Sequence, residues 1–142
     1  LSVTDEGRGA IITTTGNADC HLVLRGGSTG SNFDKAAVRH AADLLRAQQL
    51  PSRVMIDCSH DNCNKDYRQQ SQALRCVAAQ LENDPDIILG IMLESHLIAG
   101  KQPLDKNKTL QYGQSITDGC IGWAETEKLL SELASAVSRF RK

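Results

Sequence analysis

Residues that could bind a metal ion or an anion follow three short apolar runs of the sequence. Arg25 follows residues 21–24 and precedes two glycines, so its guanidinium stands where the backbone can approach a phosphate or carboxylate closely. His60 lies after the second run, and Glu94 lies directly after the third. With Asp118 they offer one imidazole and two carboxylates, a mixed set that suits Mn, Fe, Co or Zn. The pattern predicts one site shared by several loops.

The same residues allow other interpretations. Cys58, His60 and Cys63 lie within six residues of one another and could hold zinc, although no second cluster at finger-like spacing follows. Polar residues after a strand are often helix caps or solvated side chains, and Arg25 could be a surface arginine beside a glycine turn. The sequence has no dinucleotide fingerprint, phosphate-binding loop or nucleophile elbow, so it does not indicate a Rossmann domain, a nucleotide hydrolase or a serine hydrolase.

Apolar runs alternate with amphipathic helical patterns, and this alternation predicts how the candidate residues are positioned. The runs are residues 21–24, 54–56 and 87–93. Their near-continuous hydrophobicity indicates a parallel sheet covered on both faces, so the predicted fold class is α/β. The carboxyl ends of parallel strands meet at one rim, which brings residues that are distant in the sequence within reach of one ligand.

The helices between these runs are predicted from apolar residues that recur at intervals of three and four. The expected buried faces are Val38, Ala42 and Leu45, then Leu74, Val77, Ala78 and Leu81, and finally Leu130, Leu133 and Val137. Asn32 or Asp34 is expected to cap the first helix, and Trp123 to be a packing anchor before the last one. Residues 10–12 could form a short strand or an extended arm, and residues 100–118 read as a polar loop.

Composition is that of one ordinary globular domain. The chain has 142 residues, 40% of them hydrophobic, and a net charge of −1. This charge excludes the basic footprint of a nucleic-acid binder, and no apolar run approaches the roughly 18 residues of a membrane span. Five cysteines, an odd number, favour free thiols in a reducing compartment, so we expect a cytoplasmic protein. The chain starts without a signal-like leader, and we expect it to be internal to a longer product.

Four stretches of the sequence closely resemble the C-terminal part of class I 3-deoxy-D-arabino-heptulosonate 7-phosphate (DAHP) synthases. They read GNADCHLVLRGG at 16–27, VMIDCSHDN at 54–62, MLESHL at 92–97 and YGQSITDGCIGW at 112–123. The resemblance implies that the chain is a fragment of one (β/α)8 TIM-barrel domain, with a leading arm at 1–17 and the last three strand–helix units at 18–142. A complete barrel needs about 250 residues, so the barrel is incomplete as given.

The resemblance also implies a reaction and a role for each candidate residue. These enzymes condense phosphoenolpyruvate with D-erythrose 4-phosphate to give DAHP and phosphate, the first step of the shikimate pathway to aromatic amino acids, with a divalent metal ion. By position, His60, Glu94 and Asp118 match the metal ligands, and Arg25 matches the arginine that grips the phosphate of phosphoenolpyruvate. His60 would also move a proton, and Asp118 would border the aldehyde. A fourth ligand, a cysteine, and other substrate clamps lie upstream, so we expect the isolated chain to be inactive.

Partners and regulation follow from the same resemblance. The missing N-terminal part of the barrel is one expected partner, and exposed strand edges predict a homo-oligomer. The region matching residues 1–12 partly lines an aromatic amino acid feedback site, which makes Ser2 and Ile12 candidate inhibitor contacts. Two other classes remain open at this point: a non-catalytic assembly or regulatory module derived from the synthase, and a small zinc domain built on the two cysteines and His60.

Overall fold

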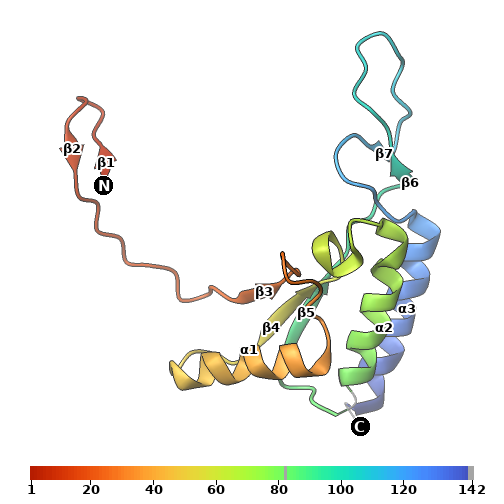
Figure 1. Ribbon diagram of the computed structural model, residues 1–142, viewed down its shortest axis with the longest axis horizontal. Helices are drawn as coiled ribbons and strands as arrows, with labels where there is room; N and C mark the ends of the chain where they lie inside the picture. Colours follow the sequence, from red (N-terminus) through yellow and green to blue (C-terminus); the bar gives the residue numbers. More distant parts are fainter. Residues whose placement is uncertain (82, 141–142) are drawn as a thin grey trace.

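The computed structural model describes residues 1–81 and 83–140, and a three-stranded parallel sheet lies at its centre. The strands are β3 (Leu22–Leu24), β4 (Val54–Asp57) and β5 (Ile88–Met92), hydrogen-bonded in that order. Helix α1 (Lys35–Ala47) connects β3 to β4, α2 (Gln70–Leu81) connects β4 to β5, and α3 (Trp123–Phe140) packs beside α2 (Figure 1). The predicted α/β class is therefore confirmed.

Helices cover one face of this sheet. Val54 and Ile56 of β4 are fully buried and share a core with Val38 of α1, Val77 of α2 and the half-buried Leu133 of α3. On the opposite face, Val23 of β3 remains 39% exposed. The expectation that both faces are covered is wrong for the described residues, because all three helices contribute to a core on the same side.

The buried faces of α1 and α2 are those that the spacing predicts. Val38 and Ala42 are buried in α1, and Leu74 and Val77 are buried in α2. Asp34, rather than Asn32, caps α1, since its carboxylate accepts the N–H groups of residues 36 and 37 at 2.9 and 3.1 Å. Periodicity thus identified these two helices correctly, including the start of the first.

The predicted face of α3 is confirmed at Leu133 and Val137, which pack against the core, and is wrong at one position. Leu129 is fully buried, whereas Leu130 is 46% exposed. Both residues fit a 3.6-residue period with Leu133, so spacing cannot choose between them, and packing against α2 decides. Trp123 is 51% exposed at the first position of α3, so the prediction that it is a packing anchor is also wrong.

Two regions outside the sheet form short strands. β1 (Ser2–Val3) and β2 (Gly9–Ala10) pair as an antiparallel hairpin at the end of an extended arm, in which Ile11 and Ile12 are exposed (Figure 1). β6 (Ile98–Lys101) and β7 (Gln114–Ser115) pair in parallel within the segment predicted as a polar loop. No helix of the described chain is long and apolar enough to cross a membrane.

Candidate metal centre

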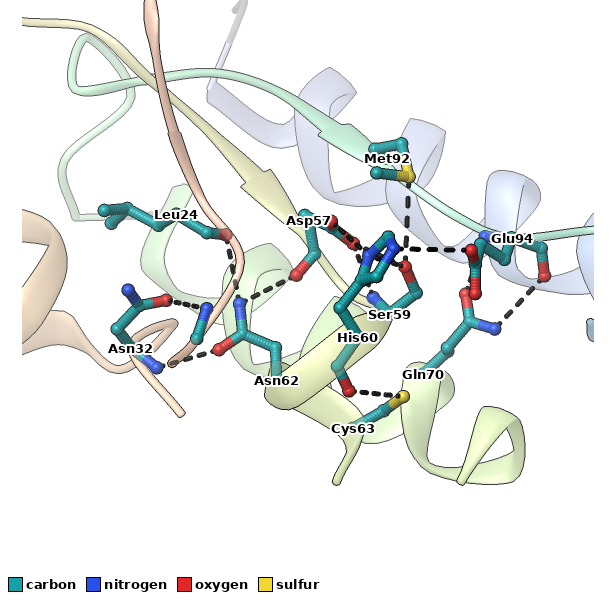
Figure 2. A network of polar contacts seen from close by, with 11 residues as sticks. Leu24, Asn32, Asp57, Ser59, His60, Asn62, Cys63, Gln70, Met92 and Glu94 are labelled. Atoms are coloured by element: carbon teal, nitrogen blue, oxygen red, sulfur yellow. Dashed lines mark hydrogen bonds and ion pairs between the residues drawn. The ribbon is translucent and has the colours of Figure 1, made fainter. Parts of the chain in front are cut away.

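Three ligand-type side chains from separate loops meet at the carboxyl edge of the sheet. One ligand atom each of His60, Glu94 and Asp118 lie within 4.8 Å of one another, and no other such group of His, Cys, Asp and Glu occurs in residues 1–81 and 83–140. The Nε2 atom of His60 is 3.6 Å from Oε1 of Glu94 (Figure 2). The structure thus brings together the three residues that the sequence singled out as metal ligands.

Backbone pairing beside the sheet brings Asp118 to Glu94. Ile121 donates its N–H to the Glu94 carbonyl at 3.0 Å, and His96 donates its N–H to the Ile121 carbonyl at 3.0 Å. A second exchange joins Gly100 and Cys120, with N–H···O distances of 2.8 and 3.1 Å. The segment that contains Asp118 therefore runs along the segment that follows β5, although a long loop separates them in the sequence.

His60 begins a 3₁₀ turn (His60–Cys63) directly after β4 and is held by its neighbours. Its backbone has a φ of 50°, in the left-handed region that is uncommon for residues other than glycine. Its Nδ1 atom lies 2.7 Å from Oδ2 of Asp57 and 2.8 Å from Oγ of Ser59. Asp57 is only 1% exposed. The imidazole therefore presents Nε2, and not Nδ1, to Glu94 (Figure 2).

Glu94 is held through its main chain by a buried glutamine of α2. Gln70 is fully buried; its Oε1 accepts the Glu94 N–H at 2.8 Å and its Nε2 donates to the Glu94 carbonyl at 3.1 Å. Burial raises the pKa of the Glu94 carboxyl above its usual value, and Asp118 adds to the rise while His60 opposes it. A carboxyl in this environment gains from a cation held against it.

Arg25 borders the same cavity, whose volume is about 450 Å³. The next residue, Gly26, has a φ of 75°, and a Cβ atom there would lie 2.7 Å from the carbonyl carbon of Asp61. Glycine is therefore the residue that this close approach requires. The first of the two glycines noted in the sequence thus has a packing role, which places Arg25 beside the loop that carries His60.

A buried asparagine joins the ends of two strands at this rim. Asn62 is 4% exposed, and its Nδ2 donates to the carbonyls of Leu24 at 3.0 Å and Asp57 at 2.7 Å (Figure 2). Its Oδ1 accepts the N–H of Asn32 at 2.8 Å, and Asn32 in turn accepts the N–H of Gly26 at 2.7 Å. These bonds fix the loop after β3 against the loop after β4.

Three further residues of the cavity wall were not singled out from the sequence. Lys65, Tyr67 and Lys101 line it together with Arg25. Lys65 follows β4 within the same loop as His60, so its position after a strand was a usable signal. Lys101 ends β6, a strand that the sequence did not indicate, and nothing local marked it. With three cationic side chains at its border, the cavity suits an anionic ligand.

The alternative zinc site on the cysteines is not supported. Cys58 is fully buried, and burial raises the pKa of its thiol to about 12. Cys63 donates its S–H to the His60 carbonyl at 3.3 Å, and burial raises its pKa as well. Zinc binds thiolates, which these environments disfavour. All five cysteines are free, as their odd number predicted.

The structure does not bring every candidate residue to this rim. Ser2 lies in β1, paired with Ala10, in the hairpin at the far end of the extended arm (Figure 1), and Ile12 is 64% exposed. Neither residue lines the cavity. His96 is exposed, and its Nδ1 accepts the N–H of Leu97 at 2.8 Å. Ser2 and Ile12 therefore belong to a surface that is separate from the metal-type group.

Comparison with known proteins identifies one family. The model of the DAHP synthetase I family matches residues 2–131. A putative phospho-2-dehydro-3-deoxyheptonate aldolase of Schizosaccharomyces pombe is 49% identical over 96% of this chain and 38% of its own length. The Phe-sensitive phospho-2-dehydro-3-deoxyheptonate aldolase of Escherichia coli K12 is 44% identical over 99% of this chain and 40% of its own length.

A solved structure has a similar fold over the length of this chain. The phospho-2-dehydro-3-deoxyheptonate aldolase of Francisella tularensis SCHU S4 superposes with a TM-score of 0.86 at 44% identity, covering 97% of this chain and 40% of that one. The chain thus spans about 40% of the length of these relatives. With a family match over residues 2–131 of 142, the chain belongs to the DAHP synthetase I family.

Proposed function

We propose that this chain is the C-terminal part of a class I DAHP synthase, which condenses phosphoenolpyruvate with D-erythrose 4-phosphate. One observation carries the proposal: His60, Glu94 and Asp118 converge beside Arg25 at the carboxyl edge of a parallel sheet. In (β/α)8 barrels the active site lies at this edge of the strands. Residues 18–142 would form the last three strand–helix units of such a barrel, and residues 1–17 its leading arm.

The residues present fit a divalent metal ion. His60 Nε2 and Glu94 Oε1 face each other at 3.6 Å, and both are electron-pair donors when the imidazole is neutral and the carboxyl ionised. Burial raises the pKa of the Glu94 carboxyl, so a cation held beside it would stabilise its ionised form. An imidazole with two carboxylates suits Mn, Fe, Co or Zn. A metal ion bound there would supply Lewis acidity toward the aldehyde oxygen.

The remaining roles fall to the chain's own groups. The Arg25 guanidinium would bind and orient the phosphate of phosphoenolpyruvate and stabilise the charge of departing phosphate. C3 of phosphoenolpyruvate attacks the aldehyde carbon, water adds at C2, and phosphate leaves. His60 is placed to take part in proton movement, and Asp118 to border the aldehyde. Lys65 and Lys101 add positive charge to the cavity wall, which suits two anionic substrates.

The two outer strands support the view that more of a barrel belongs here. β3 and β5 are the edge strands of the sheet. Beside β3, an apolar groove is lined by Leu22, Leu44 and Leu45, and beside β5 another is lined by Leu89 and Val137. A barrel has no free edges, so the upstream strands and helices would cover both grooves.

Regulation, assembly and location are part of the proposal. One relative is named Phe-sensitive, which supports an aromatic amino acid inhibitor for this protein, with Ser2 and Ile12 of the arm as candidate contacts. The exposed Val3 and Ile11 of the arm favour association into a homo-oligomer. Five free thiols suit a reducing compartment such as the cytoplasm.

The test is DAHP formation from the two substrates by the full-length protein that contains this chain. We expect activity that requires a divalent metal and is lost in His60→Ala, with metal content falling in the same variant. The 142-residue chain alone should be inactive, because a ligand and several substrate clamps lie outside it. Full activity of His60→Ala would refute the proposed site, and aromatic amino acid binding without metal or activity would favour the regulatory module.

A further inference from the structure

The Asp57 carboxylate contacts the Nδ1 side of the His60 ring, whereas Glu94 faces the Nε2 side. Asp57 is the last residue of β4 and is 1% exposed. Its position in a sheet core is unusual for an acidic residue, which is rarely buried without a specific partner. Its partners are Ser59 and His60, through bonds of 2.6 to 2.8 Å.

The proton positions in this network follow from counting donors. Oδ1 of Asp57 accepts both the N–H of Ser59 at 2.8 Å and its hydroxyl at 2.6 Å. The hydroxyl has a single proton, and its 2.6 Å contact with Asp57 is much shorter than its 4.0 Å contact with the sulfur of Met92. Ser59 Oγ therefore faces His60 Nδ1, at 2.8 Å, as an acceptor. Oδ2 of Asp57, at 2.7 Å from the same nitrogen, is an acceptor as well. Nδ1 of His60 therefore carries the proton.

The position of this proton determines which ring nitrogen of His60 can bind a metal ion. A neutral imidazole with its proton on Nδ1 has a bare Nε2, and Nε2 is the atom that points at Glu94. A metal ion binds the unprotonated nitrogen, and a hydrogen bond from the other nitrogen selects the tautomer and the ring orientation. In this loop the contacts of Nδ1 with Asp57 and Ser59, at 2.7 and 2.8 Å, hold the ring in that orientation.

We propose that Asp57 is a positioning residue, which holds His60 in the Nδ1–H tautomer with Nε2 free for a divalent metal. This proposal rests on the metal site of the proposed function and adds a residue to it. Ser59 assists by donating its hydroxyl to Asp57. Asp57 itself touches neither substrate nor metal and acts through His60 alone.

The test compares Asp57→Asn with a control that removes the same charge nearby. Asparagine can turn its NH₂ toward Nδ1, which permits the Nε2–H tautomer and blocks the ligand atom. Asp61 follows His60 directly, lines the cavity and lies 4.0 Å from Nζ of Lys65, without a side-chain bond to His60. Asp61→Asn therefore changes local charge equally but leaves the bonds to His60 intact.

Two readouts are measured on the full-length protein. The first readout is the ¹⁵N NMR spectrum of labelled histidine in the metal-free protein at alkaline pH, with the His60 signals assigned from the His60→Gln variant. His60 should carry its proton on Nδ1 in wild type and in Asp61→Asn. In Asp57→Asn the proton should shift toward Nε2. Titration with Mn²⁺ alone, followed by its electron paramagnetic resonance signal, should show an affinity about 10- to 100-fold lower for Asp57→Asn. Asp61→Asn should change it less than about threefold, since only long-range charge is altered.

The outcomes separate this inference from the proposed function. If wild type binds no Mn²⁺, the metal site of the proposed function is refuted. If wild type binds Mn²⁺ but Asp57→Asn binds equally well, or if both aspartate variants lose affinity equally, the positioning role is overturned. Should Asp57→Asn fail to fold, the wild-type spectrum still decides, because His60 in the Nε2–H form contradicts the proposal directly.

Discussion

Two buried glutamines lie at opposite ends of α2. Replacing each of them separates an effect on the proposed metal site from an effect on the stability of the fold. Gln70, at the first position of the helix, holds the main chain of Glu94 through two hydrogen bonds of 2.8 and 3.1 Å. Gln80, near the other end, is 6% exposed and donates to the carbonyl of Phe33 at 2.7 Å. Replacing each with methionine removes the bonds and keeps a flexible side chain of similar length.

The expected loss of stability is similar for the two variants. In Gln70→Met the N–H of Glu94 loses its partner, while its carbonyl keeps the N–H of Ile121 at 3.0 Å. One unpaired buried donor plus one lost bond costs about 2–3 kcal/mol of unfolding free energy. Gln80→Met leaves a carbonyl without that donor, which costs about 1–2 kcal/mol. Stability alone therefore discriminates poorly between them.

Metal affinity discriminates well. Gln70→Met frees the backbone that carries one proposed ligand, so the affinity for Mn²⁺ should fall about 10-fold or more, the range typical of groups that support metal ligands. Gln80→Met should leave it within about threefold, because Gln80 lies near the opposite end of α2 from Gln70 and bonds to Phe33, and neither of these residues lines the cavity. The assays are urea unfolding and Mn²⁺ titration of the full-length protein. Equal losses of affinity in both variants, or none in Gln70→Met, would refute the argument that Gln70 positions Glu94.

Two further predictions concern the rim and the core. Gly26→Ala should lower the thermal midpoint and weaken the phosphoenolpyruvate binding that we propose for the full-length protein, because its Cβ would lie 2.7 Å from the Asp61 carbonyl carbon. Gly27→Ala, with open space around its Cβ, should do neither, and equal effects of the two variants would contradict the packing role of Gly26. Cys58, with a pKa of about 12, should have a thiolate fraction on the order of 10⁻⁴ at pH 8, so iodoacetamide should label the exposed Cys20 first. Cys58 has no exposed surface, so it should react only when the core opens, and rapid labelling of Cys58 at pH 8, read by peptide mass mapping, would show that its thiol is not held in the core.

Local patterns were sufficient for the sheet and for two of the three helices. The apolar runs at 21–24, 54–56 and 87–93 coincide with β3, β4 and β5 within one or two residues. Asp34 was one of two predicted caps for α1, and the hydrogen bonds select it. These features depend on side chains within a few residues of one another, so the sequence alone contains the information.

Features that depend on distant partners were missed or misplaced. β6 and β7 are held by exchanges such as that between Gly100 and Cys120, which no local spacing announces. The buried face of α3 shifts from Leu130 to Leu129 because α2 selects it. Lys101 lines the cavity because it is the last residue of β6, a strand that the sequence did not indicate.

For the candidate site, the sequence determined which residue types stand at the strand ends and, through its resemblance to a family, which of them to expect as ligands. It could not determine that His60 Nε2 faces Glu94 at 3.6 Å, or that Asp57 and Gln70 support these two residues from behind. Those facts belong to the tertiary structure, because they depend on contacts between segments that meet only when β4, β5 and α2 have packed. Residue identity sets the available chemistry, and packing decides which atom of each residue is presented.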